Sequence, residues 1–306
     1  MSLIERFFNK DKPKTSAGPG QPLAVNPNMQ NGPGLQVMLN SDNHLNAMHW
    51  QETLRHFDRS MTGALVELDG DCAAQGTPLG LIGWGKHVIK VVGFNAPMPP
   101  EVVNLCLNPA HYDDAVKDQQ RAGNRAHVLL YYAGYETDPL EQYVALAATA
   151  GTLLSQGALA VTNEAARTAL PAAVLNDCGA EGEGLNVLHA LPIALLYTGL
   201  VKYDVENVPG VWMRTFANHF FGLPNFARHA EGHHQGSETL ELFSALTAHF
   251  SHSSTPLNPG DTMQLGEELW LKARLLTEDE AFLELDEHPL LVLDFIASDQ
   301  INQPSP

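Results

Sequence analysis

The stretch from Val128 to Val161 constrains the fold most, because it combines two strand signals with one strong helix signal. Val128–Tyr132 is a continuous apolar and aromatic run, which predicts a strand buried on both faces. Asp138 is a helix cap, Pro139 suits the first helical position, and Glu141 stands where a capping box needs an acid. A short strand over Ala158–Val161 follows Gly157, so the segment predicts a helix packed between strands of one sheet.

The rest of the first half repeats this alternation. Apolar segments predict strands over residues 35–39, 64–68, 79–84 and 87–94, with Gly85 as a turn between the last two. Trp50, Leu54, Phe57 and Met61 recur at helical spacing, and further helices are expected over 101–107 and 111–121. The predicted class is α+β, with mixed or antiparallel sheets, helices packed on one face, and two sub-domains.

Four segments are expected from the composition. Residues 1–34 are predicted to be a flexible tail, rich in Pro, Gly, Asn and Gln after Lys12, with a short amphipathic segment at its start. That segment is a candidate membrane or partner anchor, formed by Leu3, Ile4, Phe7 and Phe8. An N-terminal α+β domain is expected over 35–175, a Gly-rich acidic turn or linker over 176–184, and a C-terminal α+β domain over 185–297.

The second half gives fewer but clear patterns. Val211–Phe221 suits a strand that passes into a loop, and Ser237 begins a predicted helix that continues through Phe250. Leu269–Leu275 alternates apolar and charged residues, as a half-buried strand does. We expect Ala281–Leu285 and Leu290–Ile296 to pair with it as a meander.

The charge of the chain excludes some classes of partner. Lys and Arg number 17 against 35 Asp and Glu, which gives a formal net charge of −18. Such a chain repels phosphate, so nucleic acid is not an expected partner, and membrane contact is expected only through residues 1–10. Acidic residues concentrate over residues 261–299, where Lys272 and Arg274 are the only cations. This region favours a protein partner with a basic surface.

Cysteine usage indicates a reducing compartment. Cys72, Cys106 and Cys178 lie far apart and form no CxxC pair, which is typical of a cytoplasmic protein with free thiols. No apolar run reaches the roughly 18–20 residues that a membrane-spanning helix needs. Cytoplasmic localisation is the expectation.

Histidine is the only residue type that suggests chemistry. The chain has 14 histidines, and the densest group is His219, His229, His233 and His234, which are weak candidates for metal ligands. However, Gly232 and Gly236 disfavour a helix there, and no HEXXH, GxSxG, P-loop or strand-borne GxGxxG motif is present. No catalytic residue and no cofactor are therefore predicted.

Residues 210–226 carry a Trp–x–Arg–Thr strand that leads into Phe–Gly–Leu–Pro. With the following helix and acidic strands, this pattern resembles the bacterial family known as domain of unknown function 4261, over roughly residues 185–297. The resemblance implies no activity and assigns no catalytic residue. Trp212, Phe216, Phe220 and Phe221 are expected in the core, Arg214 as a paired charge, and a ligand cleft is a candidate near Arg214, Asn218 and His219.

The sequence therefore favours a non-catalytic, acidic, cytoplasmic binding protein over an enzyme. A concrete form of this hypothesis is an immunity or antitoxin-like protein that occludes a basic toxin domain. The alternative is a metal-dependent hydrolase or transferase that uses the histidines between 219 and 234. The sequence specifies no oligomeric state.

Overall fold

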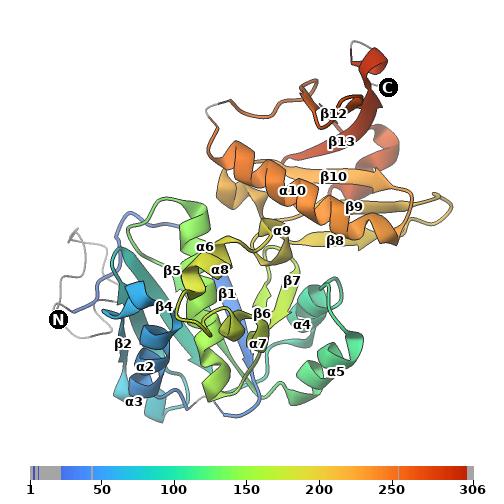
Figure 1. The fold of residues 1–306 in the computed structure, drawn as a ribbon. Helices are drawn as coiled ribbons and strands as arrows, with labels where there is room; N and C mark the ends of the chain where they lie inside the picture. The colour runs from blue at the N-terminus through green and yellow to red at the C-terminus, as the bar shows by residue number, and fades with distance from the viewer. Residues whose placement is uncertain (1–2, 4–5, 7–21, 43, 254, 302–306) are drawn as a thin grey trace. The chain divides into compact units, whose positions relative to one another are not determined.

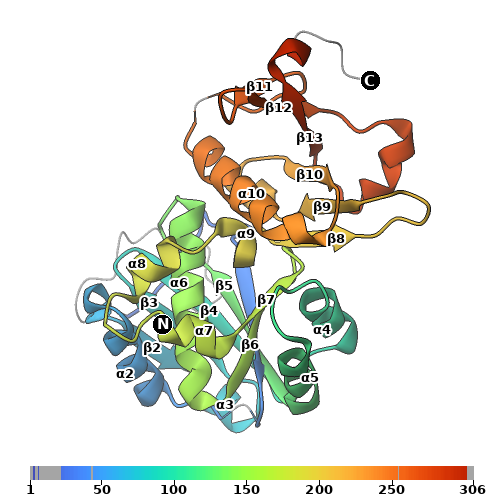
Figure 2. The ribbon, with the colours of Figure 1, turned by 45° about the vertical axis from the view of Figure 1, so that its right-hand side comes forward.

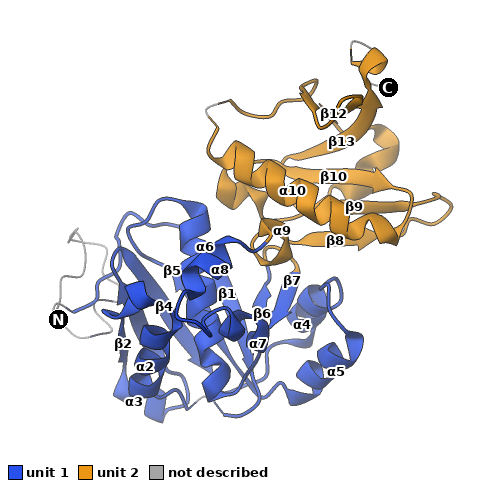
Figure 3. Ribbon diagram, in the orientation of Figure 1, with its two compact units in different colours: residues 1–164, 168–191 blue, residues 165–167, 192–306 orange. Residues whose placement is uncertain are grey.

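The computed structural model describes residues 3, 6, 22–42, 44–253 and 255–301, and the chain forms two compact units (Figure 3). Unit 1 comprises residues 1–164 and 168–191, and unit 2 comprises residues 165–167 and 192–306. The boundary lies beyond the predicted linker at 176–184. That linker belongs to unit 1, because the Asp58 carboxylate accepts a hydrogen bond from the Leu185 amide at 3.0 Å. The expected C-terminal domain over 185–297 therefore begins too early.

Unit 1 is built on a seven-stranded antiparallel sheet in the order β2-β3-β4-β5-β1-β6-β7 (Figure 1). Its strands are β1 Gly34–Leu39, β2 Leu65–Leu68, β3 Leu79–Trp84, β4 His87–Phe94, β5 Ala126–Tyr132, β6 Ala158–Asn163 and β7 Thr168–Pro171. Its helices are α2 Ala47–Phe57, α3 Gly70–Ala74, α4 Pro100–Leu107, α5 Asp114–Gly123, α6 Pro139–Gly151, α7 Ala172–Asp177 and α8 Gly184–His189. Short 3₁₀ turns occupy η1 Arg59–Met61 and η2 Thr152–Gln156.

Helices lie on both faces of this sheet near β1 and β6, where the sequence predicted one covered face. Met38 and Ala160 are cross-strand partners and pack against Cys106 of α4. Asn163 points the other way along β6, and it lies next to Tyr143 of α6. Figure 2 accordingly shows α4 and α6 on opposite sides of β1 and β6. The α+β class itself is confirmed.

Local signals set the best-predicted elements. Strands β3 and β4 have the predicted bounds, and Gly85 turns between them with φ of +51°. Asp138 caps α6 by accepting from the Leu140 amide at 2.9 Å. The prediction that β5 is buried on both faces is wrong, because burial alternates along it and Tyr131 is 43% exposed.

The predicted flexible tail does not extend over residues 22–34. Leu23 and Val25 are buried in a core cluster with Leu81 and Val88, so residues 22–34 pack against unit 1 instead of forming a flexible linker. Leu3 is partly buried against the same cluster. The other three residues of the candidate anchor lie outside the described residues. No helix among the described residues is long and apolar enough to cross a bilayer.

Unit 2 is built on a six-stranded mixed sheet in the order β11-β12-β13-β10-β9-β8. The strands are β8 Leu200–Tyr203, β9 Val211–Thr215, β10 Asn225–Ala230, β11 Thr262–Gln264, β12 Leu269–Arg274 and β13 Leu290–Ala297. Only the pairing of β10 with β13 is parallel among the described strands of this sheet. Its helical segments are α9 Ile193–Leu196, α10 Gly236–Ser251, η3 Asn218–Phe221, η4 His233–Gln235, η5 Glu278–Leu283 and η6 Ser298–Gln300.

The predicted meander is half correct. Strand β13 pairs antiparallel with β12, as expected. Residues 281–285 form no strand, because Thr277 and Glu280 build a capping box that starts η5. Glu280 also accepts two hydrogen bonds from the Arg274 guanidinium, at 2.6 and 2.8 Å. These bonds hold the segment in a 3₁₀ turn beside the sheet.

Candidate functional site

The candidate site lies in unit 2, where β9 ends and the chain passes through η3 into β10. Every residue of β9 is buried, and alternate residues of a strand point to opposite faces. Trp212 and Arg214 therefore share one face, on which Trp212 packs with Leu283 and Val292. Arg214 is 0% exposed on the same face, so its charge requires protein partners.

The segment between η5 and β13 supplies those partners. The Nη1 atom of Arg214 donates to the Leu283 carbonyl oxygen, and Nη2 lies 2.8 Å from Oδ1 of Asp286. Burial lowers the pKa of Arg214 below its ordinary value, while the Asp286 carboxylate acts in the opposite direction. The ion pair thus binds β9 to the segment that precedes β13.

A second arginine reinforces this arrangement. The Nη2 atom of Arg167 donates to the Leu285 carbonyl oxygen at 3.1 Å. The guanidinium carbons of Arg167 and Arg214 lie 4.0 and 4.4 Å from the centre of the Phe216 ring. Two cations therefore contact one aromatic ring and bind alternate carbonyl groups of residues 283–285.

Asp286 and two histidines form the polar part of the site. Asp286 accepts hydrogen bonds from the Asn225 side-chain amide at 3.3 Å and from the His288 backbone amide at 3.1 Å. The rings of His219 and His288 are stacked, with centroids 3.6 Å apart and planes inclined by 16°. Burial, and then the neighbouring His288, lower the pKa of His219 below 6.5. The uncharged form of His219 is therefore favoured.

These groups border a cavity of about 1110 Å³. Its polar lining includes Arg214, both stacked histidines and three carboxylates, and its apolar lining includes six leucines. These acidic and apolar residues are Glu284, Asp286, Glu287, Leu223, Leu257, Leu275, Leu276, Leu290 and Leu291. A second cavity, of about 640 Å³, adjoins the first and shares Pro259, Leu275 and Leu276 with it.

The structure brings together two of the three residues of the predicted cleft. Arg214 and His219 both line the larger cavity. Asn218 is fully buried beside it, where its side-chain amide donates to the Pro224 carbonyl oxygen at 2.9 Å. Asn218 thus supports the turn between β9 and β10.

The four candidate metal ligands make separate contacts. Nε2 of His229 lies 2.8 Å from the Pro209 carbonyl oxygen, and Nε2 of His233 lies 2.8 Å from Asp204. His219 stacks on His288 instead, and His234 lies exposed in η4. Within the described residues, no three His, Cys, Asp or Glu side chains come close enough to hold a metal ion.

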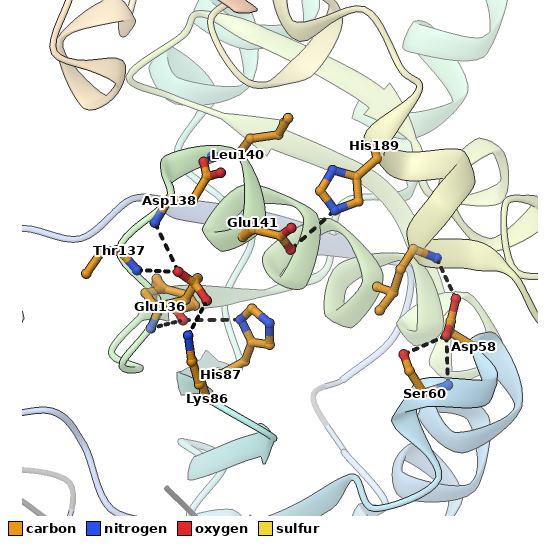
Figure 4. Close-up of polar contacts among 12 residues, drawn as sticks. Asp58, Ser60, Lys86, His87, Glu136, Thr137, Asp138, Leu140, Glu141 and His189 are labelled. Atoms are coloured by element: carbon orange, nitrogen blue, oxygen red, sulfur yellow. Dashed lines mark hydrogen bonds and ion pairs between the residues drawn. The ribbon is translucent and has the colours of Figure 1, made fainter. Parts of the chain in front are cut away.

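A second polar cluster lies in unit 1 at the start of α6 (Figure 4). The Glu136 carboxylate accepts hydrogen bonds from the amides of Thr137 and Asp138, at 2.8 and 3.3 Å, and lies 3.3 Å from Nζ of Lys86. Burial alone would raise the pKa of Glu136, but these bonds outweigh it, and the pKa lies below 4.5. In the predicted capping box, Glu141 would accept a hydrogen bond from the Asp138 backbone amide. In the structure, Glu136 accepts this bond instead.

Glu141 instead forms a pair with His189, with Oε2 and Nε2 separated by 3.2 Å. His87 is the third member of this group, and its Nδ1 lies 3.2 Å from the Tyr132 hydroxyl. Burial lowers the pKa of His87, although Glu141 raises it. A carboxylate and an imidazole at this distance can exchange a proton. In the described part of the chain, however, no hydroxyl or thiol bonds to His189, so the pair has no nucleophile to activate.

Comparisons with known proteins add nothing to this description. The sequence matches no family model, and neither the curated proteins nor the solved structures return a match. The resemblance to domain of unknown function 4261 stays a prediction.

Proposed function

We propose that this chain is a non-catalytic cytoplasmic binding protein that presents the acidic exterior of unit 2 to a protein with a basic surface. In its concrete form, the proposal is an immunity or antitoxin-like protein that occludes a basic toxin domain. The observation that carries it is the separation of charges in unit 2, where the cations are withdrawn from the surface and most of the acids remain there.

None of the lysines and arginines in the described part of unit 2 is exposed. Arg214, Arg228, Lys272 and Arg274 are buried, and Arg167 and Lys202 are partly buried. The exposed acids of unit 2 are Asp204, Glu206, Glu231, Glu238, Glu241, Asp261, Glu267, Glu268, Glu278, Asp279, Glu284, Glu287 and Asp299. Unit 2 therefore presents many exposed carboxylates, and its cations nearest the surface, Arg167 and Lys202, are partly buried and donate to carbonyl oxygens.

A surface of this kind favours one class of partner. Its negative potential accelerates encounter with a basic surface and opposes contact with acidic proteins and with nucleic acid. An enzyme needs reacting groups placed together in a cavity, and in both clusters described above the central charged groups pair with one another, as Arg214 does with Asp286 and Glu141 with His189. The exterior is thus the better supported site of action.

The test is capture from an extract of the organism that makes the protein. The full chain is immobilised and exposed to the extract at about 50 mM salt, then washed at about 1 M salt, where screening removes surface attraction. We expect a basic protein to be retained at low salt and released at high salt. A variant with Glu278, Glu284 and Glu287 changed to glutamine, three exposed acids of unit 2, should retain less of it. Failure to retain any basic protein at low salt would refute the proposal.

A further inference from the structure

We propose that the two adjoining cavities of unit 2 form a docking groove for a basic segment of the partner protein, a segment that carries arginine beside an apolar residue. We call this the Leu275 groove, after the residue that borders both cavities. The inference rests on the proposed function and adds where the partner binds and what chemistry its contacting segment has.

The apolar part of the groove is exposed without a partner in unit 2. Leu275 is 63% exposed, although it directly follows a strand whose last four residues are buried. The neighbouring Arg274 is buried, and its Nη1 donates to the Leu275 carbonyl oxygen at 3.1 Å. Leu275 and Leu276 both line the two cavities, so the border between the cavities offers an apolar surface that a partner's apolar side chain can cover.

The acidic part of the groove includes exposed carboxylates. Asp286 is engaged by Arg214, but Glu284 and Glu287 are exposed, and neither forms an ion pair with a Lys or Arg of the described residues. Glu278 lines the second cavity and is also exposed. Acids therefore stand on both sides of Leu275.

The groove is also held in place before any partner arrives. Arg167 and Arg214 bind the carbonyl groups of residues 285 and 283, and Asp286 is bonded by Asn225. A segment fixed in this way loses little conformational freedom on binding, so more of the contact energy appears as affinity. Glu284 and Glu287 are thus presented by an ordered segment.

Arginine fits this lining better than other side chains do. Its three-carbon stem packs on leucine, while its guanidinium bonds carboxylates in pairs and stacks on flat rings. The larger cavity offers leucines, Glu284 and Glu287, and the stacked rings of His219 and His288. A lysine head lacks the flat face for such stacking, and an acidic side chain would meet the glutamates. The chemistry of the groove therefore selects arginine with a neighbouring apolar residue.

The experiment uses the full chain and a fluorescent short peptide of arginine, leucine and glycine, read by anisotropy at about 50 mM salt. Three further peptides replace arginine by lysine, arginine by glutamate, or leucine by serine. We expect the arginine–leucine peptide to bind most tightly and the glutamate peptide not to bind. Equal binding of the leucine and serine peptides would refute an apolar anchor.

Matched variants locate the binding site. The double variant Glu284→Gln with Glu287→Gln removes two exposed charges at the groove, and Glu267→Gln with Glu268→Gln removes two exposed charges elsewhere in unit 2. We expect the groove variant to weaken binding about tenfold or more, and the control less than about twofold. Leu275→Ser should weaken binding, while Leu269→Ser, at a residue that is 43% exposed, should not. Circular dichroism checks that each variant is folded.

The outcomes separate this inference from the proposed function. Equal loss in the groove and control variants would show that only overall charge matters, which refutes the groove and leaves the proposed function standing. If no peptide binds but a basic partner is captured from the extract in a salt-sensitive way, the groove is likewise refuted and the proposed function stands. Absence of both peptide binding and a basic partner would refute both.

Discussion

Replacing Arg274 by methionine should destabilise unit 2 by about 3 kcal/mol at about pH 7. The Arg274 guanidinium lies 2.6 Å from Asp294 through Nε, and 2.6 and 2.8 Å from the two oxygens of Glu280. The side chains of Arg274, Glu280 and Asp294 are 10%, 13% and 33% exposed. Removing one partner of a buried ion pair costs about 3–5 kcal/mol, and the lower end applies because water reaches Asp294. Methionine keeps much of the apolar stem.

The pH dependence of this loss distinguishes lost charge pairing from lost packing. Burial alone would raise the pKa of Glu280, but hydrogen bonds from Arg274 and Thr277 outweigh it, so the pKa lies below 4.5. A depressed carboxyl pKa contributes stability that is present above 4.5 and is lost as the pH falls through the folded-state value. The difference between wild type and variant should therefore shrink at about pH 3.5.

Hydrogen exchange in increasing urea, read on peptides from β12 and β13, measures the opening free energy of unit 2 separately from that of unit 1. The matched control is Lys202→Met, which removes a partly buried cation whose Nζ donates one hydrogen bond, to the His233 carbonyl oxygen at 3.3 Å. It should cost less than about 1 kcal/mol. The reasoning is refuted if Arg274→Met lowers the opening free energy of unit 2 no more than Lys202→Met does. It is also refuted if the loss in Arg274→Met is the same at low pH as at about pH 7.

Three further predictions concern other parts of the chain. Asp58→Ala should lower the unfolding free energy of unit 1 by about 2 kcal/mol, because Asp58 caps η1 and accepts a hydrogen bond from the Leu185 amide. A urea midpoint unchanged from wild type would contradict this. The pKa of His87 should lie below 6.5 by NMR titration because of burial, and should fall further in Glu141→Gln, since Glu141 raises it; an increase would contradict the assignment. Gly199→Ala should cost more than about 1 kcal/mol, because φ is +53° and the new Cβ would meet a backbone carbonyl; an unchanged melting temperature would disprove it.

Local signals in the sequence predicted much of the fold. Strands β3 and β4 were predicted with their observed bounds, because apolar segments on either side of Gly85 define a hairpin without help from the rest of the chain. The start of α6 was predicted for the same kind of reason, since Asp138 and Pro139 act within one turn.

The errors have two different origins. Residues 281–285 have a strand-like composition, but the capping box of Thr277 and Glu280, together with the bond from Arg274 to Glu280, selects a 3₁₀ turn. This signal is local, and the Thr-x-x-Glu spacing at 277–280 could have indicated it. The segment 176–184 instead joins unit 1 through a contact between residues 127 positions apart, Asp58 and Leu185, which no window of neighbouring residues shows.

The candidate site was predicted in part, for a similar reason. Arg214 and His219 stand in the aromatic segment that drew attention to this region, but Asp286 and His288 lie about seventy residues further on. Parallel pairing of β10 with β13 sets Asn225 opposite Leu290, and this brings residues 286–288 to the turn after β9. A parallel pair needs a long crossover, and no local pattern specifies which strands it joins.

The placement of charge in unit 2 makes its stability and its proposed binding separable by mutation. Each deeply buried arginine has a carboxylate partner, as Arg214 has Asp286 and Arg274 has Glu280. Removing one of these cations leaves an acid without its partner, so the cost falls on folding. The exposed acids take no part in these ion pairs, and they repel one another weakly through water. Neutralising them should therefore leave the unfolding free energy of unit 2 unchanged or slightly raised. A loss of binding in Glu284→Gln with Glu287→Gln can therefore be assigned to the surface itself.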